Sequence, residues 1–88
     1  MVEQTVTIIN KLGLHARPAV MLVKRASQFK SDIKLLKDEM EIDGKSILGV
    51  LMLAAEKGSQ IIIKVSGEDE EEALAELVKL FNSGFNEE

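Results

Sequence analysis

The sequence predicts an α+β fold in which helices cover one face of an antiparallel sheet. Its 88 residues are enough for one domain, so residues 1–88 are taken as a single domain. Segments with alternating apolar residues and segments with helical apolar spacing follow each other in the order βαββαβα. Each segment has one apolar face, and layered domains bury such faces between a sheet and its helices.

The first two elements are a strand over residues 2–9 and a helix over residues 16–27. The strand segment is rich in Val, Ile and Thr, which favour extended structure. Pro18 has no N–H group and fits only the first turn of a helix, so the helix begins at about Ala16. Apolar residues then recur on one helical face. They are Ala19, Leu22, Val23 and Ala26.

A hairpin and a short helix follow. Apolar residues alternate with polar ones on both sides of a turn at residues 37–39. They are Ile33, Leu35, Met40 and Ile42. Ser46 then opens a short helix, because serine is a favourable N-cap. Helical spacing predicts that one face of this helix is in the core, namely Ile47, Val50, Leu51 and Ala54.

The last strand and the last helix complete the order. Apolar residues alternate over residues 61–65, after a turn at residues 57–59. The final helix begins near Glu70 and stops at Gly84, and acidic residues occupy its first turn, where the helix dipole favours them. Its predicted core face consists of Leu74, Leu77, Val78 and Phe81.

The segment Gly13-Leu14-His15-Ala16-Arg17-Pro18-Ala19 contains the candidate reactive group. It places the only histidine of the chain at the start of a helix, where free N–H groups and the helix dipole stabilise an anion by roughly 0.3–1 kcal/mol. The same positive end disfavours an imidazolium, so we expect a neutral, nucleophilic ring on His15. The guanidinium of Arg17 can pair with phosphate oxygens. These features favour phosphorylation of His15 over a role as an ordinary capping residue.

This segment resembles the active-site signature of the HPr family, the histidine-containing phosphocarriers of the phosphoenolpyruvate-dependent sugar phosphotransferase system. A second segment, Gly44-Lys45-Ser46-Ile47-Leu48-Gly49-Val50, resembles the regulatory serine region of that family. The chain length and the spacing of the two segments also match. The resemblance implies an open-faced β-sandwich with four antiparallel strands and three helices.

The resemblance implies a relay rather than an enzyme with its own turnover. Enzyme I would transfer a phosphoryl group to Nδ1 of His15, and a sugar-specific IIA domain would then receive it. Arg17 and the N–H groups of Ala16 and Arg17 would stabilise the transferred group, while Pro18 starts the helix. No metal or other cofactor is expected on this chain.

The resemblance and the helical pattern also imply a partner-binding surface and a regulatory site. Leu48 and Met52 lie opposite the predicted core face of the short helix, where large apolar residues suggest docking. The expected surface comprises Val20, Met21, Lys24, Ile47, Leu48, Gly49 and Met52. Ser46 would be the substrate of an HPr kinase/phosphorylase, and a catabolite-control transcription regulator is a further candidate partner.

Composition excludes several other classes. The absence of cysteine excludes disulfides and thiolate metal sites. The longest apolar run, residues 47–55, is too short to cross a membrane, so we expect a cytoplasmic protein without membrane insertion.

The charge of the chain is unevenly distributed. The net charge is −4, yet residues 1–30 contain five basic residues and only one acidic residue, Glu3, which predicts a basic surface near His15. Nucleic-acid binding is disfavoured, because the acidic chain has no Tyr or Trp for stacking. A monomer is expected.

Three alternatives stay open at this stage. The element order alone also fits a ferredoxin-like or ACT-type ligand-binding domain. A regulatory binding module that acts mainly through Ser46 would not need the intact histidine segment. A phosphocarrier paralogue of the nitrogen-regulation branch would share that segment. A hydrolase is disfavoured, because it would need a second catalytic group that the sequence does not offer.

Overall fold

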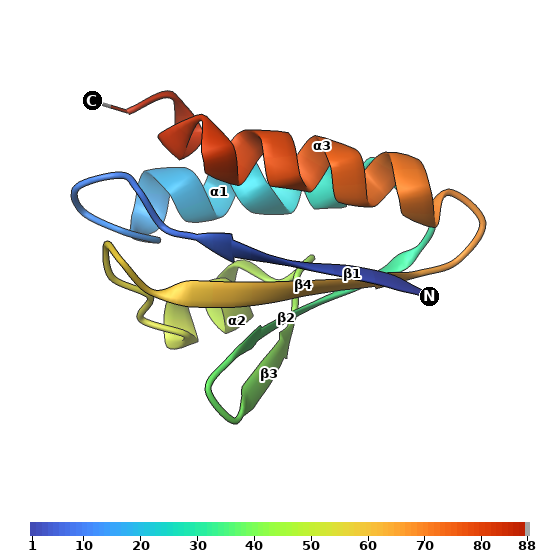
Figure 1. The fold of residues 1–88 in the computed structure, drawn as a ribbon, viewed down its shortest axis with the longest axis horizontal. Helices are drawn as coiled ribbons and strands as arrows, with labels where there is room; N and C mark the ends of the chain where they lie inside the picture. The colour runs from blue at the N-terminus through green and yellow to red at the C-terminus, as the bar shows by residue number, and fades with distance from the viewer. Residues whose placement is uncertain (88) are drawn as a thin grey trace.

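The computed structural model describes residues 1–87 and confirms the predicted fold class and element order (Figure 1). The elements are β1 (Val2–Thr7), α1 (Ala16–Ala26), β2 (Asp32–Lys37), β3 (Met40–Asp43), α2 (Ile47–Met52), β4 (Gln60–Ser66), α3 (Glu70–Asn82) and the 3-10 turn η1 (Gly84–Asn86). Within the described part of the chain, no helix combines the length and apolar character that a membrane span requires.

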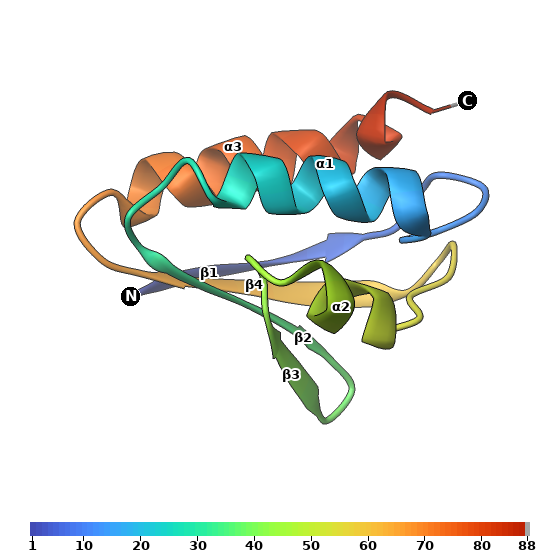
Figure 2. The ribbon, with the colours of Figure 1, turned by 180° about the vertical axis from the view of Figure 1, so that it is seen from behind.

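The four strands form one antiparallel sheet in the order β1-β4-β2-β3. Its register pairs buried residues with each other, as with Leu35 and Ile63 on neighbouring strands. Helices α1 and α3 lie side by side over one face (Figures 1 and 2). Helix α2 contacts α1 and β3, with Gly49 close to Ile42. Since Ile42 pairs with the buried Leu35, α2 joins the core on that same face.

The core face of α1 agrees with the prediction, whereas that of α3 is rotated. Ala19, Leu22 and Ala26 are fully buried, and Val23 packs against the edge of the core. In α3 the buried residues are Ala73, Leu77, Leu80 and Phe81. The predicted Leu74 and Val78 are only partly buried. The pattern contains two overlapping helical stripes, and the smaller Ala73 belongs to the one that the sheet covers.

The predicted core face of α2 is wrong at three of its four residues. Only Val50 is buried in this helix, while Ile47 and Leu51 are 44% and 38% exposed. Ala54 is exposed and has a positive φ of 49°. The helix ends at Met52, so helical spacing no longer applies at Ala54. The buried places after the helix belong instead to Leu53 and Ala55.

The end of α3 brings the C-terminal residues back over the N-terminal loop. Gly84 has a positive φ of 63° and ends the helical path, as predicted. Phe85 is then buried, with its ring edge against Phe81 at a centroid distance of 5.0 Å. Strand β1 ends at Thr7 rather than at residue 9, although Ile8 remains buried and donates its N–H to the carbonyl of Ser59.

Candidate functional site

His15 is the N-cap residue of α1. Its backbone is extended, with φ −85° and ψ −166°, and its carbonyl accepts the N–H of Ala19 at 3.0 Å. The imidazole does not cap the helix. The N–H groups of Ala16 and Arg17 precede the first intrahelical hydrogen bond, and Pro18 has none to offer. The ring therefore lies at a helix start whose first donors have no intrahelical acceptor.

Gly13 fixes the loop that leads to His15. Its φ is +69°, a conformation that side chains rarely adopt, and a Cβ there would overlap the carbonyl oxygen of Ala55. The next residue, Leu14, is buried and donates its N–H to that same carbonyl at 2.9 Å. The loop before His15 is thus held against the chain that follows α2.

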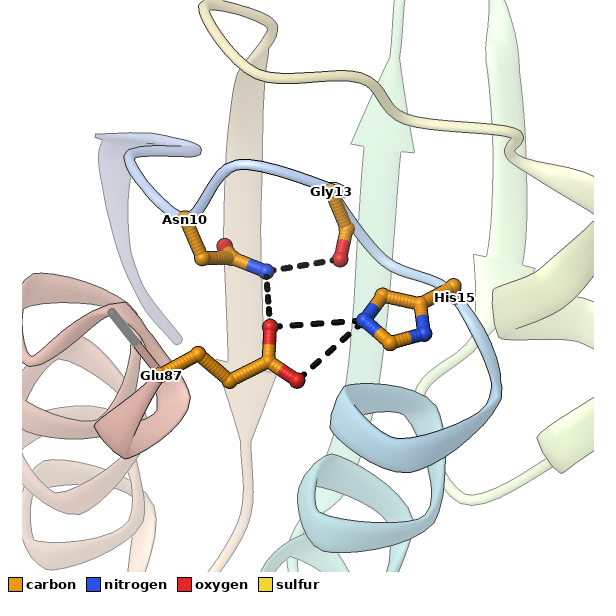
Figure 3. Close-up of polar contacts among 4 residues, drawn as sticks. All are labelled: Asn10, Gly13, His15 and Glu87. Carbon is orange, nitrogen blue, oxygen red and sulfur yellow. Dashed lines mark hydrogen bonds and ion pairs between the residues drawn. The ribbon is translucent and has the colours of Figure 1, made fainter.

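The side chain of Glu87 reaches the imidazole of His15. Nε2 of His15 lies 3.2 Å from Oε2 and 3.3 Å from Oε1 of Glu87 (Figure 3). Asn10 donates from Nδ2 to Oε1 of Glu87 at 3.1 Å and to the carbonyl of Gly13 at 2.7 Å. The side chain of His15 is 35% exposed and that of Glu87 is 19% exposed, so the contact is partly shielded from water.

The charge of Glu87 is favoured by this environment. Burial raises the pKa of its carboxyl, but hydrogen bonds from Asn10 and His15 and the charge of Arg17 help to lower it below its ordinary value. The other ring nitrogen of His15, Nδ1, faces away from Glu87 (Figure 3). The carboxylate of Glu87 therefore contacts Nε2 of the ring and does not contact Nδ1 (Figure 3).

Two of the five basic residues that predict a basic surface near His15 are paired with acidic residues. Arg25 pairs with Glu76 at 3.0 Å, and Lys30 lies 3.5 Å from Glu68. Lys11, Arg17 and Lys24 are exposed and have no carboxylate within 4.0 Å among residues 1–87. Arg17 lines a shallow depression together with Lys11, Leu12, Asn86 and Glu87.

Across the described residues, no three of the side chains that commonly ligate metals lie close enough together to hold an ion.

Ser46 is the N-cap of α2, as predicted, and its hydroxyl accepts the N–H of Gly49 at 3.0 Å. Its helix exposes an apolar patch next to α1. This α2 patch consists of Ile47, Leu48, Leu51 and Met52, which are 44%, 70%, 38% and 60% exposed.

Helix α1 adds less apolar surface than expected. Val20 and Met21 are half-buried, and Met21 packs against the core. Lys24 is exposed, whereas Gly49 faces Ile42 and is half-buried. The expected surface is therefore centred on α2, with Lys24 beside it on α1.

The sequence analysis missed Asn10 and Glu87 as parts of the site. Asn10 is 2% exposed, and Glu87 lies 72 residues from His15 along the chain. Glu87 belongs to the acidic C-terminal part of the sequence, and such charged segments usually form solvent-exposed surface. Only the aromatic spacing of Phe81 and Phe85 hints that the chain returns to the core there.

Comparisons with known proteins give a consistent result. A family model described as "PTS HPr component phosphorylation site" matches residues 2–83. The phosphocarrier protein HPr of Neisseria meningitidis serogroup A is 47% identical over 87 residues, which cover 99% of this chain and 98% of that protein. The phosphocarrier protein NPr of Escherichia coli K12 is 48% identical over 88 residues, with 99% and 98% covered. The crystal structure of HPr-C-His from Thermoanaerobacter tengcongensis superposes with a TM-score of 0.97 at 45% identity, and covers 100% of this chain and 99% of that one.

Proposed function

This chain belongs to the HPr family of phosphocarriers of the phosphotransferase system, and we propose that it carries the phosphoryl group on His15. Enzyme I, phosphorylated from phosphoenolpyruvate, is the proposed donor, and a sugar-specific IIA domain is the proposed acceptor. The observation that carries this proposal is the placement of the imidazole at the start of α1, beside N–H groups without intrahelical acceptors.

In the proposed step, the lone pair of Nδ1 on His15 attacks the phosphorus of a phosphohistidine on the donor. The new N–P bond forms as the old one breaks, and the electron pair of the broken bond returns to the donor nitrogen. The exposed guanidinium of Arg17 and the N–H groups of Ala16 and Arg17 stabilise the charge on the phosphoryl oxygens. Pro18 positions these donors by starting the helix directly after His15.

The α2 patch is the proposed docking surface for the donor and the acceptor. Its exposed apolar side chains lie on a helix that contacts α1, whose first turn presents His15. Lys24 and Arg17 on α1 add positive charge that would attract acidic partner surfaces. A partner seated on α2 would thus also cover the start of α1.

Ser46 is a proposed regulatory site for an HPr kinase/phosphorylase, and its phosphorylated form is a candidate ligand for a catabolite-control regulator. A phosphate on Ser46 would add about −1.5 to −2 charges beside Leu48 and the rest of the α2 patch. We expect weaker docking of Enzyme I without refolding, because the helix start itself tolerates an anion. The phosphomimetic variant Ser46→Asp should therefore slow phosphorylation of His15, and an unchanged rate would contradict this role.

A nitrogen-branch phosphocarrier is the second candidate function. It is favoured by the 48% identity to the NPr of Escherichia coli K12, which equals the identity to HPr relatives within a few per cent. Both branches use the same chemistry at His15 and differ in the proteins on either side of the relay. An assay of transfer from the phosphorylated chain separates the two functions. It compares transfer to a sugar-specific IIA domain with transfer to a nitrogen-branch IIA domain.

Incubation with phosphoenolpyruvate, magnesium and Enzyme I tests the carrier function. We expect intact-mass analysis to show one phosphoryl group that acid treatment removes, and to show none on His15→Ala. Folding of that variant is checked by circular dichroism. A folded wild-type chain that takes up no phosphoryl group would overturn the proposal.

A further inference from the structure

We infer that Glu87, held by Asn10, is a positioning residue that keeps the proton of the His15 ring on Nε2 and leaves Nδ1 as the attacking nitrogen. The inference rests on the proposed function, because it concerns which nitrogen of His15 receives the phosphoryl group. It assigns a role to two residues that lie outside the motif around His15.

The hydrogen-bond chemistry fixes the proton. An ionised carboxylate has only acceptors, so Nε2 of His15 must be the donor in its contacts of 3.2 Å and 3.3 Å with Glu87. The neutral ring has one N–H, which leaves an unshared lone pair on Nδ1. That nitrogen faces away from Glu87 (Figure 3).

Asn10 holds the carboxylate in place. Both partners of its Nδ2, the carbonyl of Gly13 and Oε1 of Glu87, are acceptors, so the amide can be oriented in only one way. The backbone of Asn10 also accepts the N–H of Gly13 at 3.2 Å. One nearly buried residue thus fixes both the turn that leads to His15 and the carboxylate that binds its ring.

The C-terminal segment is anchored well enough to hold Glu87 there. Phe85 is 1% exposed and packs against Phe81, and the N–H of Glu87 bonds to the carbonyl of Gly84 at 3.0 Å. Two residues separate the fully buried Phe81 of α3 from the start of η1. Glu87 directly follows η1, and its carboxylate points at His15 (Figures 1 and 3).

The charge of Glu87 also matches the chemistry of transfer. When Nδ1 forms its bond to phosphorus, the ring keeps its Nε2 proton and gains one positive charge, while the donor ring loses one. The carboxylate of Glu87 stabilises that charge through the Nε2–H bond, in the way that a carboxylate orients and stabilises a catalytic histidine in hydrolases. A ring that stays protonated is also the better leaving group when the phosphoryl group moves on.

Chemical phosphorylation of the full chain with phosphoramidate tests this role without Enzyme I. The two isomers of phosphohistidine are resolved by 31P NMR, which reads both the rate and the nitrogen that reacts. For Glu87→Ala we expect about tenfold slower reaction at Nδ1, which corresponds to about 1.4 kcal/mol. Nε2 product should also appear, because the ring loses its hydrogen bond to a charged group. Glu87→Gln keeps an acceptor oxygen and should give Nδ1 product alone, at an intermediate rate.

Glu72→Ala is the matched control, because Glu72 is exposed in the first turn of α3 and should behave as the wild type. Wild-type rate and product distribution in Glu87→Ala would overturn the inference. A slower rate with Nδ1 product alone would overturn the claim that Glu87 keeps the ring proton on Nε2. Failure of the proposed function is seen separately, as a wild-type chain that Enzyme I does not phosphorylate.

Discussion

Replacement of Leu48 by Ala should weaken docking of Enzyme I and leave the fold intact. Leu48 is 70% exposed at the start of α2, so little of its side chain contributes to the core. The free energy of unfolding should therefore change by less than about 0.5 kcal/mol. Burial of a complete leucine contributes about 1.5–3 kcal/mol, and a partner that covers Leu48 would gain roughly 1–2 kcal/mol from its exposed part. The loss corresponds to a rise in KM of about five- to thirtyfold.

The assay measures initial rates of phosphoryl transfer from phosphorylated Enzyme I as the concentration of the chain varies. KM should rise while kcat stays constant, because the contact exists before and during transfer alike. Leu74→Ala is the matched control, since Leu74 lies on α3 and packs against the core. That variant should lose stability and keep its KM. A Leu48→Ala chain with wild-type KM, or with reduced kcat at unchanged KM, would refute the docking role of the α2 patch.

Three further predictions concern stability and local geometry. Gly13→Ala should lower the free energy of unfolding by more than about 1 kcal/mol and slow phosphorylation of His15, because the new Cβ meets Ala55 and φ is positive; denaturant unfolding and transfer rates check both. Ser46→Ala should cost about 0.5–2 kcal/mol through loss of the cap on α2, measured by thermal unfolding. Hydrogen bonds from the Ser31 hydroxyl and the Lys30 backbone lower the pKa of Asp69 from 3.8 to about 2. The stability that Asp69 adds over Asp69→Asn should thus be complete above about pH 4 and disappear as the pH falls through about 2, which unfolding at stepped pH would show.

The fold could be predicted because its signals are local. Pro18 and Gly84 mark where α1 begins and α3 ends, and alternating apolar residues mark the strands. The helix faces were harder to predict. Helix α2 has six residues, five of them apolar, so periodicity alone cannot say which side the core covers. Its main contacts are with α1 and β3, and these leave Ile47 and Leu51 exposed.

Only those parts of the site that lie close together along the chain could be predicted. Proximity along the chain puts Arg17 and Pro18 beside His15, and the helix geometry follows from them. Glu87 reaches His15 because Phe85 is buried against Phe81. The spacing of the two phenylalanines hints that the chain returns to the core, but nothing local in the sequence indicates that Glu87 meets His15, 72 residues away. The imidazole therefore lies between two electrostatic features. The motif predicts the helix start, whereas only the folded structure shows the carboxylate.

Onward transfer from the isolated phosphorylated chain tests the carrier function most directly. The chain is phosphorylated, freed of Enzyme I and phosphoenolpyruvate, and mixed with a IIA domain while the masses of both proteins are followed. If His15 carries the phosphoryl group in a relay, the chain should lose it as the IIA domain gains it, and His15→Ala should transfer none. Release of inorganic phosphate with no gain on the sugar-specific or the nitrogen-branch IIA domain would contradict the account.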